Sequence, residues 1–381
     1  MTRGNPMPTT TRSAVLWNHN EDWKIEEVVL DDPGPGEVLV EMRVAGMCHS
    51  DEHVVQGDML IPHFPFIGGH EGSGVVTQVG PGVNSLEVGD HVSMSFIPAC
   101  GRCKYCSTGR QSLCDEGAKL FDNQMMTRGL GDVSHTIGET EAARFAQLGT
   151  FSEHLLVSES SLVKVEKDLP FDAVALVSCG VATGWGSAVH RAKVKPGDNV
   201  AVIGVGGVGI NAVQGAAMAG AKRVIAIDPV EFKREKAMEM GATHTYSSIE
   251  EAALAVPELT WGEMCDAVIL VPGVVTGDMV EPALGLTAKG GTLVVTAIGN
   301  MMEGSADLNL FFLSMMNKSI KGTVFGSGNP RADIPALLSM YREGTLKLDE
   351  LVTNRYKLDD VNQGYQDLRD GKNVRGVIDF S

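Results

Sequence analysis

Residues 199–209 read NVAVIGVGGVG, an apolar run of strand length that passes directly into a glycine-rich loop. A helix-like, alanine-rich stretch follows at 210–219, and a second strand-like run ends in Asp228. The glycine pattern alone is weak evidence, but strand, loop, helix, strand and acid in this order are specific for a dinucleotide site. The alternative is a glycine-rich turn that only packs a helix on a sheet. The glycines expected to let the backbone approach the pyrophosphate are Gly204, Gly206, Gly207 and Gly209.

Asp228 indicates which dinucleotide is bound. A carboxylate at the end of the second strand accepts hydrogen bonds from the adenosine ribose and repels a 2'-phosphate. Pro229 stands where an arginine would suit NADP. Both residues favour NAD.

The rest of the chain shows two kinds of sequence pattern, and a length of 381 residues favours two domains. Apolar runs at 199–204, 223–228, 266–271 and 292–298 alternate with helical stretches, which predicts a Rossmann-type doubly wound parallel sheet. Short β-rich runs punctuated by glycine fill residues 36–95, and similar pieces return near the C-terminus. We therefore expect an α/β nucleotide-binding domain at 182–324 and a mainly β catalytic domain at 1–181 and 325–381, with a cleft between them.

Composition excludes several classes of function. The formal charge is -17, which argues against nucleic acid as a partner because phosphates would not be neutralised. No apolar run approaches the ~18 residues needed to cross a membrane, and no secretory leader is evident. The chain is predicted to be cytoplasmic, and clustered cysteines in a reducing compartment are more often metal ligands than disulfides.

Four cysteines form a compact lobe at about 98–116. Four thiolates close around one ion in a tetrahedron, and zinc is the default ion for that ligand set. An iron–sulfur cluster or unbound buried cysteines are the alternatives. A closed site leaves no position for substrate, so its role would be structural. The four ligands are Cys100, Cys103, Cys106 and Cys114.

Cys48, His70 and Cys179 offer a second ligand set, two thiolates and one imidazole. Such a set holds catalytic zinc with the fourth position open. Taken singly, each residue has an ordinary structural reading as a small core cysteine or a histidine bonded to the backbone, and Cys265 is assigned to the core.

The surrounding motifs resemble the zinc-dependent medium-chain alcohol dehydrogenases. The matching segments are residues 46–51 (GMCHSD), 68–76 (GGHEGSGVV), the cysteine lobe, 179–184 (CGVATG) and the glycine loop, in the family's order. Residues 96–103 and 325–335 further resemble the subgroup that uses the artificial acceptor nitrosodimethylaniline. The resemblance implies a GroES-like β barrel as the catalytic domain, with catalytic zinc, structural zinc and NAD as cofactors.

The family resemblance also implies a mechanism. Zinc would activate an alcohol, and a hydride would pass to the nicotinamide. Ser50 would take the alcohol proton, which would move through the nicotinamide ribose to His53 for exchange with solvent. Asp51 would orient His70, and Glu71 would tune the metal. Solvated surface roles are the alternatives for these four side chains.

Coenzyme and substrate contacts follow from the same resemblance. His49 and Arg375 are expected on the pyrophosphate, although His49 replaces an arginine found in other family members. The remaining coenzyme contacts are Lys233 near the ribose, Thr183 and Val208 against the nicotinamide, and Ile298. Apolar pocket walls would be Met59, Phe96, Trp185, Ile298 and Val324, which suit an alcohol or aldehyde.

Three further readings stay open. The enzyme could oxidise a formaldehyde–thiol adduct, with Arg128 or Arg144 binding the thiol's carboxylates. It could instead hold NAD permanently and pass electrons to another acceptor, or be a nucleotide-binding protein without turnover. A homodimer or homotetramer is expected, because the strand-like edge at 319–325 invites pairing. The alcohol, the physiological acceptor and the path of residues 117–148 do not follow from the sequence.

Overall fold

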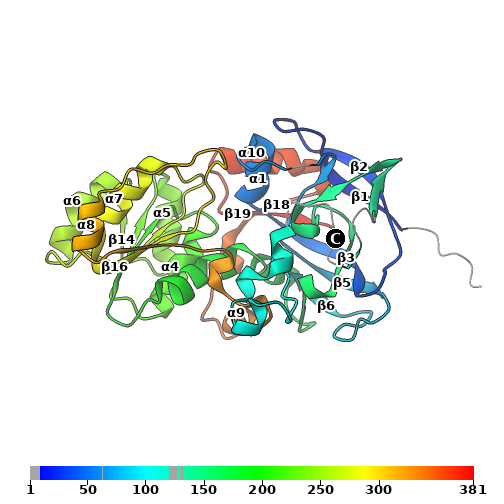
Figure 1. Cartoon of the computed structure of the whole chain (residues 1–381), viewed down its shortest axis with the longest axis horizontal. Helices are drawn as coiled ribbons and strands as arrows, with labels where there is room; N and C mark the ends of the chain where they lie inside the picture. The colour runs from blue at the N-terminus through cyan, green and yellow to red at the C-terminus, as the bar shows by residue number, and fades with distance from the viewer. Residues whose placement is uncertain (1–8, 62, 120–126, 129–132) are drawn as a thin grey trace, which may run out of the picture. The chain divides into compact units, whose positions relative to one another are not determined.

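The computed structural model describes residues 9–61, 63–119, 127–128 and 133–381. The chain divides into two compact units (Figure 1). Unit 1 comprises Met1–Cys179 and Asn329–Ser381, and unit 2 comprises Gly180–Gly328. Within the described ranges, no helix has the length and apolar character that a membrane crossing requires.

Unit 2 is built on one parallel sheet of six strands. Their spatial order, β14-β13-β12-β15-β16-β17, places the first strand of the unit in the middle, as in doubly wound nucleotide-binding folds. All five residues of the central strand are buried because neighbours flank it on both sides. The strands are β12 (Asn199–Ile203), β13 (Arg223–Ile227), β14 (His244–Tyr246), β15 (Cys265–Leu270), β16 (Thr287–Val295) and β17 (Ser319–Gly322).

Helices connect these strands. The helix after β12 begins at Gly209, directly behind the glycine loop, so its N-terminus faces the end of the central strand. The helices of unit 2 are α3 (Gly180–Gly186), which continues as a π-helix (Ser187–Ala192), α4 (Gly209–Met218), α5 (Glu231–Glu239), α6 (Ile249–Leu259), α7 (Val280–Gly285) and α8 (Leu310–Met315).

Unit 1 contains two mainly antiparallel sheets. The first has the order β8-β7-β2-β1-β4-β9. Its strands are β1 (Thr9–Leu16), β2 (Lys24–Leu30), β4 (Phe66–Ile67), β7 (His135–Ile137), β8 (Thr140–Glu141) and β9 (Ala143–Arg144). The second has the order β11-β6-β5-β3-β19-β18, with β10 also paired to β3. Its strands are β3 (Glu37–Met47), β5 (Gly72–Val79), β6 (His91–Met94), β10 (His154–Ser158), β11 (Leu162–Val165), β18 (Val352–Tyr356) and β19 (Arg375–Asp379).

Strand β3 organises the second sheet. It pairs with β5, β10 and β19, so it joins the N-terminal and C-terminal parts of unit 1. Four helices complete the unit: α1 (His49–Gln56), α2 (Phe171–Leu176), α9 (Pro330–Arg342) and α10 (Val361–Arg369). Short 3-10 helices of the chain span Cys106–Thr108, Gln111–Leu113, Asp115–Lys119, Phe145–Gln147, Glu159–Ser161, Gly277–Met279, Phe325–Ser327, Asp349–Leu351 and Leu358–Asp360.

Candidate active site

Four buried side chains of unit 1 converge although they are far apart in sequence. Cys48 lies between β3 and α1, His70 and Glu71 lie between β4 and β5, and Cys179 is the last residue before α3. One potential ligand atom from each lies within 4.8 Å of the others, and all four residues are buried. A buried set of two sulfurs, an imidazole and a carboxylate fits a divalent metal ion such as zinc.

The two thiols share one negative charge. The Cys179 thiol and His70 stabilise the Cys48 thiolate and hold the pKa of Cys48 well below its usual value. Cys48 and burial raise the pKa of Cys179 well above the usual value. Burial disfavours the charged form of His70, but Asp51 and Cys48 outweigh it and raise the histidine's pKa. A cation bound here would replace the proton that Cys179 keeps and would stabilise both thiolates.

Asp51 lies where a residue that orients His70 must lie. Its Oδ2 is 3.1 Å from His70 Nδ1, and its Oδ1 accepts the Gly69 N–H at 2.7 Å. Burial raises the pKa of Asp51, with His70 opposing that shift. The other ring nitrogen, Nε2, is 3.9 Å from Glu71 Oε1 and so is directed to the thiol side. This is the arrangement by which a carboxylate fixes the tautomer of a metal-binding histidine.

Glu71 and Arg375 form a buried ion pair. Arg375 begins β19, which pairs with β3, and its Nη2 donates to Glu71 Oε2. Burial raises the pKa of Glu71 to about 7, against the opposing effect of Arg375. Within the part of the chain that the structure describes, Glu71 Oε1 is buried and has no hydrogen-bond partner, as expected for an atom beside an ion site. The sequence analysis assigned Arg375 only to the coenzyme, and no local signal predicts its contact with Glu71.

Helix α1 carries the predicted proton-transfer residues and places Ser50 next to Cys48. Ser50 Oγ is 3.6 Å from Cys48 Sγ, and His49 is exposed at the first position of the helix. His53 is only 3% exposed, and its Nδ1 lies 3.0 Å from Asp58 Oδ2. Asp58 therefore lies against the ring, and the exchange of a proton between His53 and solvent stays a prediction.

Aromatic side chains surround His70. The ring of Phe145 has its centroid 4.7 Å from that of His70, and Phe96 makes an edge contact at 5.6 Å. Phe96 was predicted as a pocket wall, whereas Phe145 was not, because it lies in the segment 117–148 that sequence reasoning left unplaced. Met59 is buried in unit 1, and the other three predicted wall residues belong to unit 2: Trp185, Ile298 and Val324.

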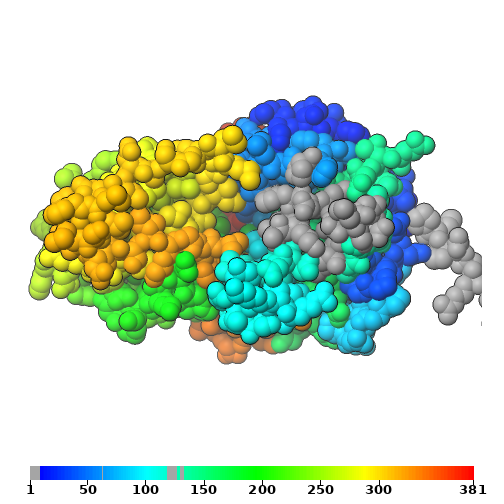
Figure 2. Space-filling model, in the orientation of Figure 1, coloured from blue at the N-terminus to red at the C-terminus, as the bar shows by residue number. Residues whose placement is uncertain are grey.

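The second cysteine group also comes together. The four Sγ atoms lie within 4.8 Å of one another, and those of Cys100 and Cys106 are 3.9 Å apart. The Cys106 N–H donates to Cys103 Sγ at 3.4 Å, which helps to hold negative charge on sulfur. The lobe lies on the molecular surface, within the cyan region of Figure 2. Four thiols in this arrangement fit a tetrahedral zinc ion.

Unit 2 carries a cradle for a dinucleotide. Asp228 Oδ2 accepts the Val205 N–H at 3.0 Å and its Oδ1 accepts the Val230 N–H at 2.9 Å, which ties the loop to the end of β13. A methyl group added at Gly206 would meet no atom within 4 Å, so the loop has room for a ligand there. Thr183 Oγ1 is buried without a hydrogen-bond partner.

Two further predicted coenzyme residues belong to unit 2. Lys233 is on α5, and Ile298 follows β16; both are partly buried. Sequence reasoning missed Arg234, whose Nη1 donates to the carbonyls of Asp228 at 2.7 Å and Pro229 at 2.9 Å. Arg234 stands six residues after Asp228, close to the acid that indicates the dinucleotide, and this closeness was the available signal.

The two candidate arginine anchors are engaged elsewhere in unit 1. Arg128 binds Glu37 and Asp31, with its Nε 2.8 Å from Glu37 Oε1. Arg144 is 2% exposed and donates to the Leu156 carbonyl at 3.3 Å. Burial lowers the pKa of Arg144 to about 10. Parts of the segment 117–148, namely 120–126 and 129–132, lie outside the described residues.

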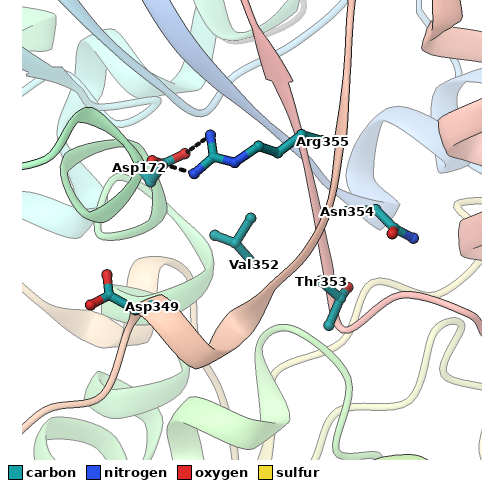
Figure 3. A pocket seen from close by; sticks show the side chains of 6 residues that line it. All are labelled: Asp172, Asp349, Val352, Thr353, Asn354 and Arg355. Atoms are coloured by element: carbon teal, nitrogen blue, oxygen red, sulfur yellow. Dashed lines mark hydrogen bonds and ion pairs between the residues drawn. The ribbon is translucent and has the colours of Figure 1, made fainter.

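A separate hollow of about 500 Å³ in unit 1 contains none of the predicted site residues. Figure 3 shows Arg355 and Asp172 joined by two hydrogen bonds at its edge, at 2.8 and 2.7 Å. This pairing engages the one cationic side chain that lines the hollow in the described part of the chain. It is lined by Asp172, Asp349, Val352, Thr353, Asn354 and Arg355.

Comparisons with known proteins agree with this arrangement. Residues 34–167 match the alcohol dehydrogenase GroES-like domain, and residues 207–343 match the zinc-binding dehydrogenase family. The chain is 51% identical over 368 residues to the NDMA-dependent alcohol dehydrogenase of Amycolatopsis methanolica, covering 97% of this chain and 98% of that protein. It is 32% identical over 374 residues to S-(hydroxymethyl)glutathione dehydrogenase of Paracoccus denitrificans, covering 97% and 99%.

A solved structure extends the match to the fold. Benzyl alcohol dehydrogenase from Acinetobacter calcoaceticus superposes with a TM-score of 0.89 at 30% identity, covering 98% of this chain and all of that one. The predicted fold class and the resemblance to the NDMA-dependent subgroup are confirmed, and the reading without turnover is set aside. This chain is an oxidoreductase and belongs to the family of zinc-dependent medium-chain alcohol dehydrogenases.

Proposed function

We propose that the protein oxidises an alcohol to an aldehyde or ketone with NAD as hydride acceptor. The observation that carries the proposal is the buried convergence of Cys48, His70 and Cys179 within one compact unit. No ordinary core explains two thiols and an imidazole that share charge at this distance while a neighbouring carboxylate oxygen stays unpartnered.

In this proposal Cys48, His70 and Cys179 would hold a zinc ion, which would supply Lewis-acid activation of the substrate oxygen. Asp51 keeps the His70 ring in the orientation that ligation requires. Arg375 balances the charge of Glu71, so that the carboxylate does not compete permanently with substrate for the ion. Phe96 and Phe145 exclude water from the His70 side of the site and strengthen electrostatic interactions there.

Proton removal is assigned to α1. Ser50 lies beside Cys48, and its hydroxyl both accepts and donates a proton, which suits it to receive the alcohol's proton. His53 follows three residues later, on the same face of the helix, and provides the imidazole that takes the proton onward. Both roles are proposals that rest on position and residue type.

The coenzyme is assigned to unit 2, where NAD would supply the hydride acceptor. The N-terminus of α4 and the open space at Gly206 suit a pyrophosphate, and the carboxylate of Asp228 disfavours a 2'-phosphate. His49, Thr183, Lys233, Ile298 and Arg375 remain proposed coenzyme contacts.

An alcohol is preferred to a formaldehyde–thiol adduct. The relative named for the thiol adduct is 32% identical, against 51% for the NDMA-dependent alcohol dehydrogenase. Neither Arg128, which is paired with two carboxylates, nor the buried Arg144 offers an exposed guanidinium for a thiol's carboxylates.

The 51% identical relative favours a second form of the same function, in which NAD stays bound and another acceptor reoxidises it. The test adds a primary alcohol and excess NAD to desalted protein and follows absorbance of reduced nicotinamide. A continuing rise supports exchangeable NAD, and a single rise matching the protein concentration supports bound NAD. No rise with any alcohol, but turnover with formaldehyde and a thiol, would contradict the alcohol assignment.

The remaining assignments are structural and cellular. We assign a structural zinc to the lobe at about 98–116, and a cytoplasmic location. A homodimer or homotetramer is proposed because β17 ends the sheet of unit 2 and the neighbouring chain segments expose apolar side chains. The exposed residues are Met301, Met302, Leu310, Phe311, Phe312 and Met315; those of α8 lie in the orange surface of Figure 2.

A further inference from the structure

His53 is too deeply buried to be the outer end of a proton route. Its side chain is 4% exposed, whereas the side chain of Asp58, whose Oδ2 lies 3.0 Å from His53 Nδ1, is 22% exposed. The carboxylate is therefore in contact with the imidazole and is the more exposed of the two groups. A proton that reaches His53 has a partner through which it can continue outward.

The turn after α1 is what brings Asp58 to this place. The helix ends at Gly57, whose φ of 79° is left-handed and suits glycine. The Gly57 N–H donates to the Val54 carbonyl at 3.3 Å, and the Met59 N–H donates to the His53 carbonyl at 3.1 Å. Because the chain folds back over the last helical turn, Asp58 lies against the ring of His53 and does not continue along the helix axis.

The chemistry of the pair fixes which nitrogen carries the proton. An ionised carboxylate only accepts hydrogen bonds, so Nδ1 of His53 must donate to Asp58. The neutral imidazole then has Nε2 as its only basic nitrogen. In known proton-transfer sites, a carboxylate in this position holds the histidine in one tautomer and stabilises the imidazolium that forms when the ring takes a proton.

We propose that Asp58 is the outer member of the proton route, holding His53 as the Nδ1–H tautomer and handing its proton to solvent. When Nε2 gains a proton, the N–H bond at Nδ1 breaks and an O–H bond forms on Asp58. Asp58 then gives that proton to water and returns to the carboxylate, with no change in electron count. This role of Asp58 rests on the proposed function of His53. Asp58 both positions the imidazole ring and relays its proton.

Kinetic tests use Asp58→Ala and Asp58→Asn, with Asp32→Asn as the matched control. Asp32 is exposed and lies in the same unit, so its change removes one negative charge away from α1. We expect kcat for alcohol oxidation in dilute buffer to fall about 10–100-fold in both Asp58 variants, the lower part of the range for lost acid–base groups. KM for the alcohol should stay within about twofold, and added acetate should restore kcat in Asp58→Ala, because a free carboxylate replaces the lost one.

A second readout needs neither metal nor coenzyme turnover. Nitrogen-15 spectra of histidine-labelled protein, with His53 assigned through His53→Gln, should show Nδ1 protonated in the parent chain. In Asp58→Ala this preference should be lost, while the signals of the other histidines stay in place. An Nε2–H tautomer of His53 in the parent chain overturns the proposal.

The outcomes separate this inference from the proposed function. If none of the alcohols tested allows the parent protein to reduce NAD, the proposed function itself is contradicted. An active parent, an impaired His53→Gln and an Asp58→Ala variant as fast as Asp32→Asn contradict only the role of Asp58. Loss of activity in Asp58→Ala with a lowered melting temperature, an unchanged tautomer and no response to acetate would show a purely structural role, which also overturns the inference.

Discussion

Two alanine substitutions in the glycine loop should have different effects: Gly209→Ala should lower stability, and Gly206→Ala should weaken NAD binding. At Gly209 an added Cβ would stand 1.8 Å from the Gly204 carbonyl oxygen, a backbone atom that no side-chain rotation removes. Helix α4 must shift by roughly 1 Å or more to restore contact distance. Overpacking of this kind costs typically 1–3 kcal/mol, and the rigid obstacle places Gly209→Ala near about 3 kcal/mol. For a unit of this size the melting temperature should fall by roughly 6–12 °C.

At Gly206 the same methyl group meets nothing within 4 Å. Stability should therefore stay within about 0.5 kcal/mol of the parent. The methyl occupies the space that a pyrophosphate needs against the loop backbone. We expect NAD affinity of Gly206→Ala to fall at least about tenfold, a loss of about 1.4 kcal/mol.

Calorimetric melting without added coenzyme and titration with NAD measure the two effects separately. If nucleotide co-purifies, the bound fraction is counted after denaturation of each variant. The reasoning is refuted if Gly209→Ala melts with the parent, or if Gly206→Ala binds NAD as the parent does.

Three further outcomes are expected. Burial, together with Arg144 and Arg128, holds the pKa of His135 well below 6.5, so the folded protein keeps this histidine neutral where the unfolded chain takes up a proton. The free energy of unfolding is therefore kept above pH 6.5 and falls below it. Relative to His135→Gln, the parent should lose up to about 1.4 kcal/mol of this free energy per pH unit below pH 6.5. Urea unfolding at pH 7 and 5.5 measures the difference. Cys106→Ser should remove one of two expected zinc ions per chain and expose the lobe to protease while the Cys48 site keeps its metal, and unchanged metal content would contradict the lobe assignment. Phe311→Asp, on exposed α8, should lower the mass in sedimentation, whereas Leu254→Asp, at a still more exposed position on α6, should not.

The nucleotide-binding sheet was predictable because its strands are short apolar runs between clear turns. Strands β12 and β13 begin at Asn199 and Arg223, where the sequence pattern placed them. Strand β16 begins at Thr287 and not at Thr292 as predicted. A register shift against β15 and the glycines at 290–291 interrupt the apolar pattern there, so periodicity alone located only the second half of the strand.

The site was predictable in its residue types and less so in its contacts. Motifs single out Cys48, His70 and Cys179 as candidate ligands, and those ligand roles stay predictions. The pairing of Glu71 with Arg375 joins residues 304 positions apart and depends on β19 lying beside β3, which no local pattern encodes. The contact between His53 and Asp58 depends on the left-handed backbone of Gly57, which a sequence motif does not record.

The position of β19 in the chain bears on how the enzyme is made. Residues 180–328 of unit 2 interrupt unit 1, and Arg375 and Tyr365, whose hydroxyl donates to the Cys48 carbonyl at 3.4 Å, come after that interruption. Translation proceeds at roughly 5–20 residues per second, so the nucleotide-binding unit emerges whole from the ribosome while the catalytic unit still lacks its closing strand. During those seconds the nascent polypeptide carries its cysteines and His70 without Arg375 to balance Glu71. Glu71 thus gains its arginine partner only when synthesis is nearly complete.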